Sequence, residues 1–173
     1  MAKQFVIEAV MLAIYGELMT PAHPVEYLIP ISTIYELEEL IHVPEPIMLN
    51  PDDDKHVRKV MEEMIQFFRD PFKRKKTEKH LIAPMSTVSF PFQHGVILTL
   101  VRADDNMMWG ELFDPIETEQ MLTAIHFEAP LLTDQPDWQD RLLEYLVPLQ
   151  FYDIEDFEFA LELGISAHDL RDL

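Results

Sequence analysis

The chain contains no cysteine among its 173 residues. This excludes disulfides, thiolate zinc sites and cysteine nucleophiles, and it fits an intracellular protein, so we expect a cytoplasmic location. No apolar run reaches the roughly 18 residues that a membrane-spanning helix needs, and we expect no association with a membrane. Residues 5–19 come closest, but they carry Glu8 and Glu17 and lack the basic region of a signal peptide. Only four glycines are present and they stand apart, so there is no glycine-rich phosphate loop.

Basic residues are also scarce, with 13 Lys and Arg against 32 Asp and Glu, for a net charge of −19. Such a chain repels nucleic acid unless its positive charge is concentrated. Here nine of the 13 lie between residues 55 and 79, and they are Lys55, Arg58, Lys59, Arg69, Lys73, Arg74, Lys75, Lys76 and Lys79. The densest run, RDPFKRKKTEKH, has two interpretations: a solvated helix end or loop, or a patch that contacts phosphates.

Hydrophobic patterning predicts alternating strands and helices. The expected strands cover 5–8, 27–30, 130–134 and 147–153, with a hairpin formed by 88–92 and 95–103 in which Pro91 confines the first strand to an edge. The expected helices cover 10–19, 35–41, 57–68, 114–129, 139–146 and 154–163. The N-terminal pattern also permits one continuous helix. Helices that alternate with strands in the second half predict an α/β fold with a parallel sheet.

Capping signals locate several helix ends. Ser32 or Thr33 is expected to cap the helix over 35–41, which would place Glu36 in its first turn. Asp114 and Glu117 form a capping box around Pro115. Gly164 is expected to end the last helix. Outside the helices, Trp109 with Met107 and Met108 is expected to belong to the core or to a partner surface.

Acidic residues gather near the ends of the predicted strands. Glu8 closes the first strand, Glu36 follows the second, and Asp134 and Asp137 follow the strand at 130–134, while Glu117 begins the helix that leads into that strand. The carboxyl ends of parallel strands meet at one edge of a sheet, where α/β proteins place their sites. Convergent carboxylates suit Mg²⁺ or Mn²⁺, and two such ions promote phosphodiester hydrolysis.

Four short motifs, in order, resemble those of the PIN-like domains, which include metal-dependent ribonucleases. They are FVIEAVML with Glu8, YLIPISTIYELEEL with Glu36, ETEQMLTAIHFEAPLLT with Glu117, and TDQPDW with Thr133, Asp137 and Trp138. The closing VPLQFYDIEDF resembles the last strand and helix of the family. The chain departs from the pattern where Glu8 and Glu117 replace Asp, and where Gln135 replaces the first Asp of the fourth motif.

The resemblance implies one PIN-like domain over residues 1–173, a short parallel sheet flanked by helices, with residues 42–110 as an insertion or divergent middle. It implies RNA hydrolysis with Mg²⁺ or Mn²⁺ held by Glu8, Glu36, Glu117 and Asp134, with Asp137 as a further catalytic acid. Thr133 would position the substrate. The basic residues Arg69, Lys73, Arg74, Lys75 and Lys76 would hold the RNA backbone. The alternative is a non-catalytic PIN-like scaffold whose acidic surface binds a basic protein partner.

Each acid also has an ordinary structural explanation. Glu8 and Glu36 would then lie on solvated helix faces, Glu117 would serve only its capping box, and Asp134 and Asp137 would be turn or N-cap residues.

Overall fold

One six-stranded sheet organises the computed structural model, which describes residues 2–93, 95–103 and 111–163. The strand order is β3-β4-β2-β1-β5-β6, and every strand is parallel to its neighbours except β3, which pairs antiparallel with β4. The strands are β1 (Lys3–Val6), β2 (Val25–Pro30), β3 (Thr87–Gln93), β4 (Val96–Val101), β5 (Leu131–Leu132) and β6 (Phe151–Tyr152). The predicted α/β fold with a mostly parallel sheet is confirmed.

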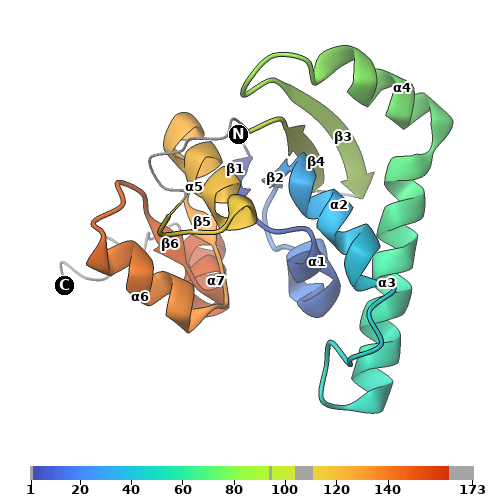
Figure 1. Cartoon of the computed structure of the whole chain (residues 1–173), viewed down its shortest axis with the longest axis horizontal. Coiled ribbons are helices and arrows are strands. Elements are labelled where there is room, and N and C mark those ends of the chain that lie inside the picture. Colours follow the sequence, from blue (N-terminus) through green and yellow to red (C-terminus); the bar gives the residue numbers. More distant parts are fainter. Residues whose placement is uncertain (1, 94, 104–110, 164–173) are drawn as a thin grey trace.

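Helices cover both faces of this sheet (Figure 1). They are α1 (Val10–Ile14), the 3₁₀ helix η1 (Gly16–Met19), α2 (Ile31–Leu40), α3 (Pro51–Arg69), α4 (Pro71–His80), α5 (Pro115–Phe127), α6 (Pro136–Glu144) and α7 (Ile154–Leu163). In the part of the chain that the structure describes, no helix is long and apolar enough to cross a membrane.

Alternate side chains of the central strands enter two separate cores. Phe5 and Tyr27 pack with α1, α3 and α7 on one face, while Val6 and Leu28 pack with α5 and α6 on the other. Strands buried on both faces are typical of parallel sheets, which explains why these segments read as continuous apolar runs. Trp138 of α6 is 1% exposed and anchors the second core.

Helices α3 and α4, in the middle of the chain, both begin at a residue whose side chain caps the helix. Asn50 caps α3 by accepting hydrogen bonds from the backbone N–H groups of Asp52 and Asp53, and Pro51 occupies the first turn. Asp70 ends α3 and caps α4 at once, since its side chain accepts from the Lys73 backbone N–H. The basic run is therefore a second helix, and none of its residues is buried.

Residues 42–110 supply part of the sheet and of the core. Strand β4 pairs with β2 over six residues, from Val25↔Val96 to Pro30↔Val101. The apolar face predicted for 57–68 is confirmed, because Val57, Met61, Met64 and Ile65 of α3 are buried in the first core. Pro91 lies on β3 at the edge of the sheet, as predicted. That the segment is an insertion in a PIN-like domain stays a prediction.

One open alternative is excluded and two local predictions are wrong. A continuous N-terminal helix is excluded because residues 3–6 form a central strand before α1 and η1. Neither Ser32 nor Thr33 caps α2, which begins at Ile31 directly after the strand and has Pro30 as its N-cap with no side-chain hydrogen bond. Glu36 consequently lies in the second turn rather than the first. The predictions for residues 107–109 and Gly164 lie outside the described residues.

Helix α7 is held to the sheet by aromatic packing. Phe157 is 2% exposed, and its ring lies 4.9 Å from that of Phe5 in an edge-to-face contact. We predict that Phe157→Ala lowers the free energy of unfolding by about 3–5 kcal/mol, because a large buried ring leaves a cavity. The matched control on the same helix is Phe159→Ala, which should cost less than about 1 kcal/mol because Phe159 is 39% exposed. Equal losses in urea denaturation would contradict the docking of α7.

Candidate functional site

Glu8 and Glu36 meet at the carboxyl ends of the adjacent parallel strands β1 and β2. Glu8 lies in the loop after β1, and Glu36 lies on α2, which leaves β2 directly. Thr33 ties the two segments together: its Oγ1 accepts a hydrogen bond from the Ala9 backbone N–H (3.2 Å) and donates to the Pro30 carbonyl (2.9 Å). Thr33 is 1% exposed, so this link is buried. The predicted convergence of the first two acids is therefore present.

The two carboxyl groups share a proton. Burial, reinforced by the charge of Glu36 and a hydrogen bond to it, raises the pKa of Glu8 to about 8. Burial also raises the pKa of Glu36, although the hydrogen bond from Glu8 opposes that rise. Oε2 of Glu36 is buried and has no hydrogen-bond partner among the described residues. At neutral pH Glu8 is mainly neutral and donates to Glu36.

Two further carboxylates lie close enough to act on this pair. The charges of Asp134 and Asp114 both raise the pKa of Glu8, and Asp114 also raises that of Glu36. Asp134 follows β5 and is exposed, and its Oδ2 accepts a hydrogen bond from the Tyr15 hydroxyl at 2.6 Å. Burial and this hydrogen bond raise the pKa of Tyr15, so the hydroxyl stays a donor. The edge of the sheet is thus acidic beyond the pair itself.

Glu117 is engaged elsewhere. It closes the predicted capping box with Asp114: its backbone N–H donates to Asp114 Oδ1 (2.7 Å), and its Oε1 accepts from the Asp114 backbone N–H (3.0 Å). Both carboxylate oxygens also accept from the Arg141 guanidinium, at 3.1 and 2.5 Å. Glu117 is only 8% exposed, so Arg141 neutralises a buried charge. A cation of the chain itself already occupies the position where the resemblance implies a metal.

The remaining predicted residues shape the turn between β5 and α6. Thr133 is 2% exposed, and its hydroxyl accepts from the Gln135 backbone N–H (3.2 Å), which makes it a turn-forming residue. Gln135 is the N-cap residue of α6 but makes no side-chain cap. Asp137 lies in the first turn of α6 with its side chain 97% exposed, 3.8 Å from Arg141 Nε.

A metal would meet two different environments here. Among the residues that the structure describes, no group of three or more His, Asp or Glu is arranged to hold a metal ion. Glu8 and Glu36 fit a divalent cation as a pair, because Glu36 has a buried oxygen without a hydrogen-bond partner and its neighbour Glu8 carries a carboxyl that can lose its proton. Glu117 does not fit, because Arg141 already neutralises it. Mg²⁺ is often held by only one or two carboxylates, with water and substrate phosphates as the other ligands.

The predicted backbone-binding residues lie on α3 and α4. Lys73 Nζ lies 3.3 Å from the centroid of the Phe67 ring of α3, and Lys76 Nζ lies 5.3 Å from that of the Phe90 ring of β3. Arg69 is 3.5 Å from Glu38 of α2. Helix α4 therefore contacts α3 and β3 through these two lysines, whereas Arg69 joins the end of α3 to α2.

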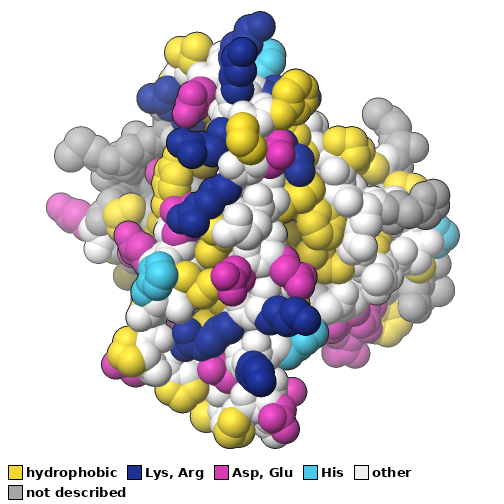
Figure 2. Space-filling view, turned by 90° about the vertical axis from the view of Figure 1, so that its right-hand side faces the viewer, with side chains coloured by type: hydrophobic (Ala, Val, Ile, Leu, Met, Phe, Trp, Pro, Cys, Tyr) yellow, Lys and Arg dark blue, Asp and Glu magenta, His cyan; other side chains and the backbone are white. Residues whose placement is uncertain are grey.

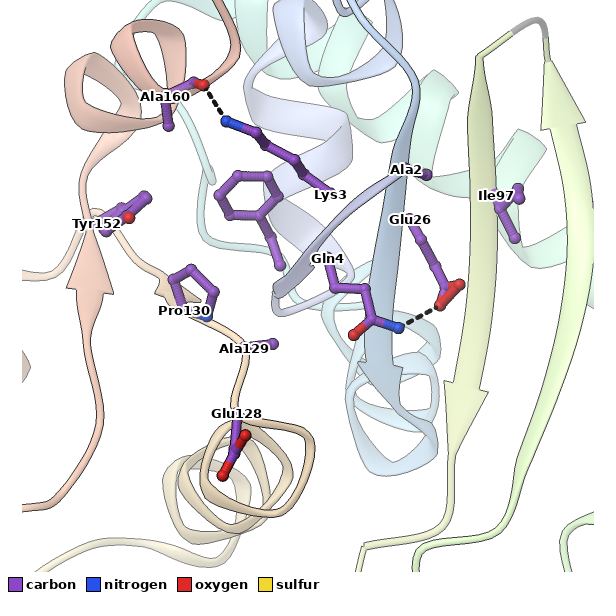
Figure 3. Close-up of a pocket in the computed structure, with 11 residues that line it drawn as sticks. Ala2, Lys3, Gln4, Glu26, Ile97, Glu128, Ala129, Pro130, Tyr152 and Ala160 are labelled. Carbon is purple, nitrogen blue, oxygen red and sulfur yellow. Dashed lines mark hydrogen bonds between the residues drawn. The ribbon is translucent and has the colours of Figure 1, made fainter. Parts of the chain in front are cut away.

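A cleft of about 690 Å³ lies at the other edge of the sheet, where the strands begin. Figure 3 shows Lys3 reaching the Ala160 carbonyl of α7 and Gln4 reaching Glu26 of β2. These hydrogen bonds join β1 to α7 and to β2. Glu128 also lines the cleft. The cleft lies at the amino ends of the strands, away from the acidic pair, and its lining carries no comparable cluster of acids.

Sequence reasoning missed three residues of the site. Asp114 was expected only as a helix cap, yet its charge acts on Glu8 and Glu36. Tyr15 and Arg141 gave no signal, because their partners Asp134 and Glu117 lie 119 and 24 residues away along the chain. The spacing of Asp137 and Arg141, four residues apart on one helix, is the one local signal that could have indicated an acidic neighbour of the arginine.

Comparison of the chain with models of known protein families finds no family that matches. Comparison with curated proteins likewise finds no match. The interpretation of the site therefore depends on its own residues and geometry.

The shared proton of Glu8 predicts a pH-dependent stability. The folded pKa of about 8 exceeds the ordinary value of 4.5, so folding takes up a proton between these values, and stability falls as the pH rises through that interval. We predict that Glu8→Gln gains roughly 2–4 kcal/mol on the wild type between pH 5 and pH 9, since a tenfold change in proton affinity corresponds to about 1.4 kcal/mol. Urea denaturation across this range measures it. Glu62→Gln, an exposed change on α3, should run parallel to the wild type.

The ion pair of Arg141 and Glu117 predicts an energetic coupling. Arg141→Met leaves the buried Glu117 carboxylate without its cation and should cost about 3 kcal/mol of stability. Adding Glu117→Gln should recover part of that loss, so that the two changes are not additive in a double-mutant cycle. Asp137→Asn removes only the exposed partner and should cost less than about 0.5 kcal/mol. Additive losses would contradict the pairing.

Proposed function

We propose that this chain is a divergent PIN-like protein that binds one divalent cation, Mg²⁺ or Mn²⁺, between Glu8 and Glu36 and hydrolyses phosphodiester bonds of RNA. The observation that carries the proposal is the carboxyl pair itself. Two acids lie at the carboxyl ends of adjacent parallel strands, and hydrogen bonds of the buried Thr33 join the segments that carry them. The side chains that act most strongly on the pKa values of both acids are themselves acidic. Such a pair is unfavourable for folding unless a proton or a cation compensates its charge.

A divalent cation supplies charge compensation at the phosphate and activates water. The residues of the chain have separate roles in this proposal. Glu8 would hold the cation after losing its proton to solvent, and Glu36 would hold it through its unpartnered oxygen. Asp134 is the exposed acid of the group, and Tyr15 fixes its orientation. In this proposal Asp134 would accept the proton of the water that attacks the phosphate, as the P–O bond to the leaving ribose oxygen breaks. Glu117 takes no part, because Arg141 holds it.

The same ion pair favours a second candidate function, a non-catalytic PIN-like scaffold. Replacing a metal by Arg141 would keep the fold of an acidic site without its chemistry. In addition, Gln135 stands where the PIN-like pattern has an Asp, so the site would have one acid fewer. The exposed acidic surface would then bind a basic protein partner. Fold does not imply function, so the two candidates must be separated by measurement.

Binding of Mn²⁺ separates them. At pH 8.5, millimolar Mn²⁺ should raise the melting temperature of the wild type by several degrees, because the cation binds only the folded pair. Glu8→Gln and Glu36→Gln should each abolish the rise, whereas Glu62→Gln on α3 should keep it. The apparent affinity should fall as the pH drops below 8, close to tenfold for each pH unit, because a proton then competes at Glu8.

Hydrolysis is tested on a labelled single-stranded RNA with Mn²⁺ present. Cleavage that disappears in Glu8→Gln and Glu36→Gln, and falls at least tenfold in Asp134→Asn, would support the nuclease. A wild type that shows neither a Mn²⁺-dependent shift nor cleavage would overturn the proposal in favour of the scaffold. Metal binding without cleavage would retain the cation site and remove the enzymatic activity.

A further inference from the structure

Positive charge is concentrated on one helical corner of a strongly acidic chain. Six of the 13 basic residues lie within the eleven residues from Arg69 to Lys79, and the chain as a whole carries −19. Helix α4 buries none of its residues. Figure 2 shows Lys and Arg side chains over the top of the molecule, where α4 lies, and again lower on the same face, with hydrophobic and acidic side chains between them. Apart from Lys73 and Lys76, which contact the Phe67 and Phe90 rings, the basic side chains of α4 are exposed to solvent.

A cleft of about 510 Å³ runs beside this helix. Its lining comes from α2, the end of α3, α4 and the end of β4, and includes Tyr35, Glu38, Phe68, Arg69, Arg74 and Glu78. Tyr35 is 57% exposed, so much of its side chain is open to solvent. Arg69 lies 3.5 Å from Glu38, whereas Arg74, which also lines the cleft, is exposed. The cleft therefore combines an aromatic surface with a cation, and its two carboxylates can accept hydrogen bonds from amino groups.

We infer that the α2–α4 cleft, with the outer face of α4, binds single-stranded nucleic acid, with a base on Tyr35 and the phosphates on Arg74, Lys75 and Lys79. Aromatic side chains beside cations are the pattern by which proteins hold single strands, because every base has a face that stacks. A duplex keeps its bases paired and stacked inside and offers none to Tyr35. The cleft volume lies within the range that admits a small-molecule group such as one base.

Helix α2 joins this cleft to the acidic pair. Its residues Ile31, Ile34, Tyr35 and Glu38 line the cleft, while Glu36 of the same helix meets Glu8. A strand that crosses α2 would therefore place one nucleotide in the cleft and a neighbouring phosphate near the acids. That the bound strand is the substrate rests on the proposed function, whereas binding in the cleft does not.

Binding is measured by fluorescence anisotropy with a labelled 12-nucleotide single-stranded RNA in EDTA, which prevents metal-dependent cleavage. The wild type should bind it at least tenfold more tightly than a 12-base-pair duplex. Tyr35→Leu should weaken binding fivefold or more through loss of stacking. Lys75→Gln/Lys79→Gln should weaken it tenfold or more and lower the slope of log affinity against log salt by about 1.4. Thermal unfolding checks that the variants stay folded, as expected for exposed positions.

The matched control is Lys55→Gln/Lys59→Gln, which removes the same charge from exposed positions on α3. It should change affinity less than twofold. An equal loss in both pairs, no binding by the wild type, or an equal preference for duplex would overturn the inference. So would binding of polyglutamate or phosphatidylserine vesicles in place of RNA. RNA binding that depends on Tyr35 and α4, combined with no Mn²⁺ effect and no cleavage, would retain this inference and remove the proposed function.

Discussion

The parallel pairing of β1 with β2 is the constraint on which the site depends. The register Phe5↔Tyr27 and Val6↔Leu28 brings both strand ends to one edge, and the buried Thr33 then fixes the loop after β1 against the first turn of α2. Two carboxyl groups that would repel each other in water are held together because the cores on both faces stabilise this pairing. Holding Glu8 and Glu36 close together costs folding free energy, and packing in the two cores offsets that cost.

The chain compensates its acids in two chemically different ways. Around Glu117, a fixed cation from α6 removes the charge permanently, which stabilises the contact between α5 and α6 and leaves nothing for a ligand. Around Glu8 and Glu36, only an exchangeable proton does so. An exchangeable proton can be displaced by a cation, whereas a tethered guanidinium cannot without moving a helix. This difference limits the acidic site to a pair and its exposed neighbour Asp134.

The sequence predicted the elements better than their contacts. Local signals such as Asp114 with Glu117, or the apolar face of α3, act over a few residues, so they located helices and the sheet type. The position of Glu36 was misjudged by a turn, because α2 starts directly at the end of β2 without a side-chain cap. The partners Arg141 and Tyr15 were missed because long-range pairing depends on how α6 and α1 pack, and periodicity carries no information on that.

Helix α2 gives the two inferred sites a common wall. Its residues at 31, 34, 35 and 38 repeat with the helical period and line the α2–α4 cleft. Glu36 lies about 100° away from Tyr35 around the helix, so it faces another direction and meets Glu8. A rotation or shift of α2 would therefore disturb both places together. Thr33 opposes such a shift from inside the core. The burial of one hydroxyl thus helps to fix where the α2–α4 cleft and the acidic pair lie relative to each other, which makes Thr33 a structural link between the two.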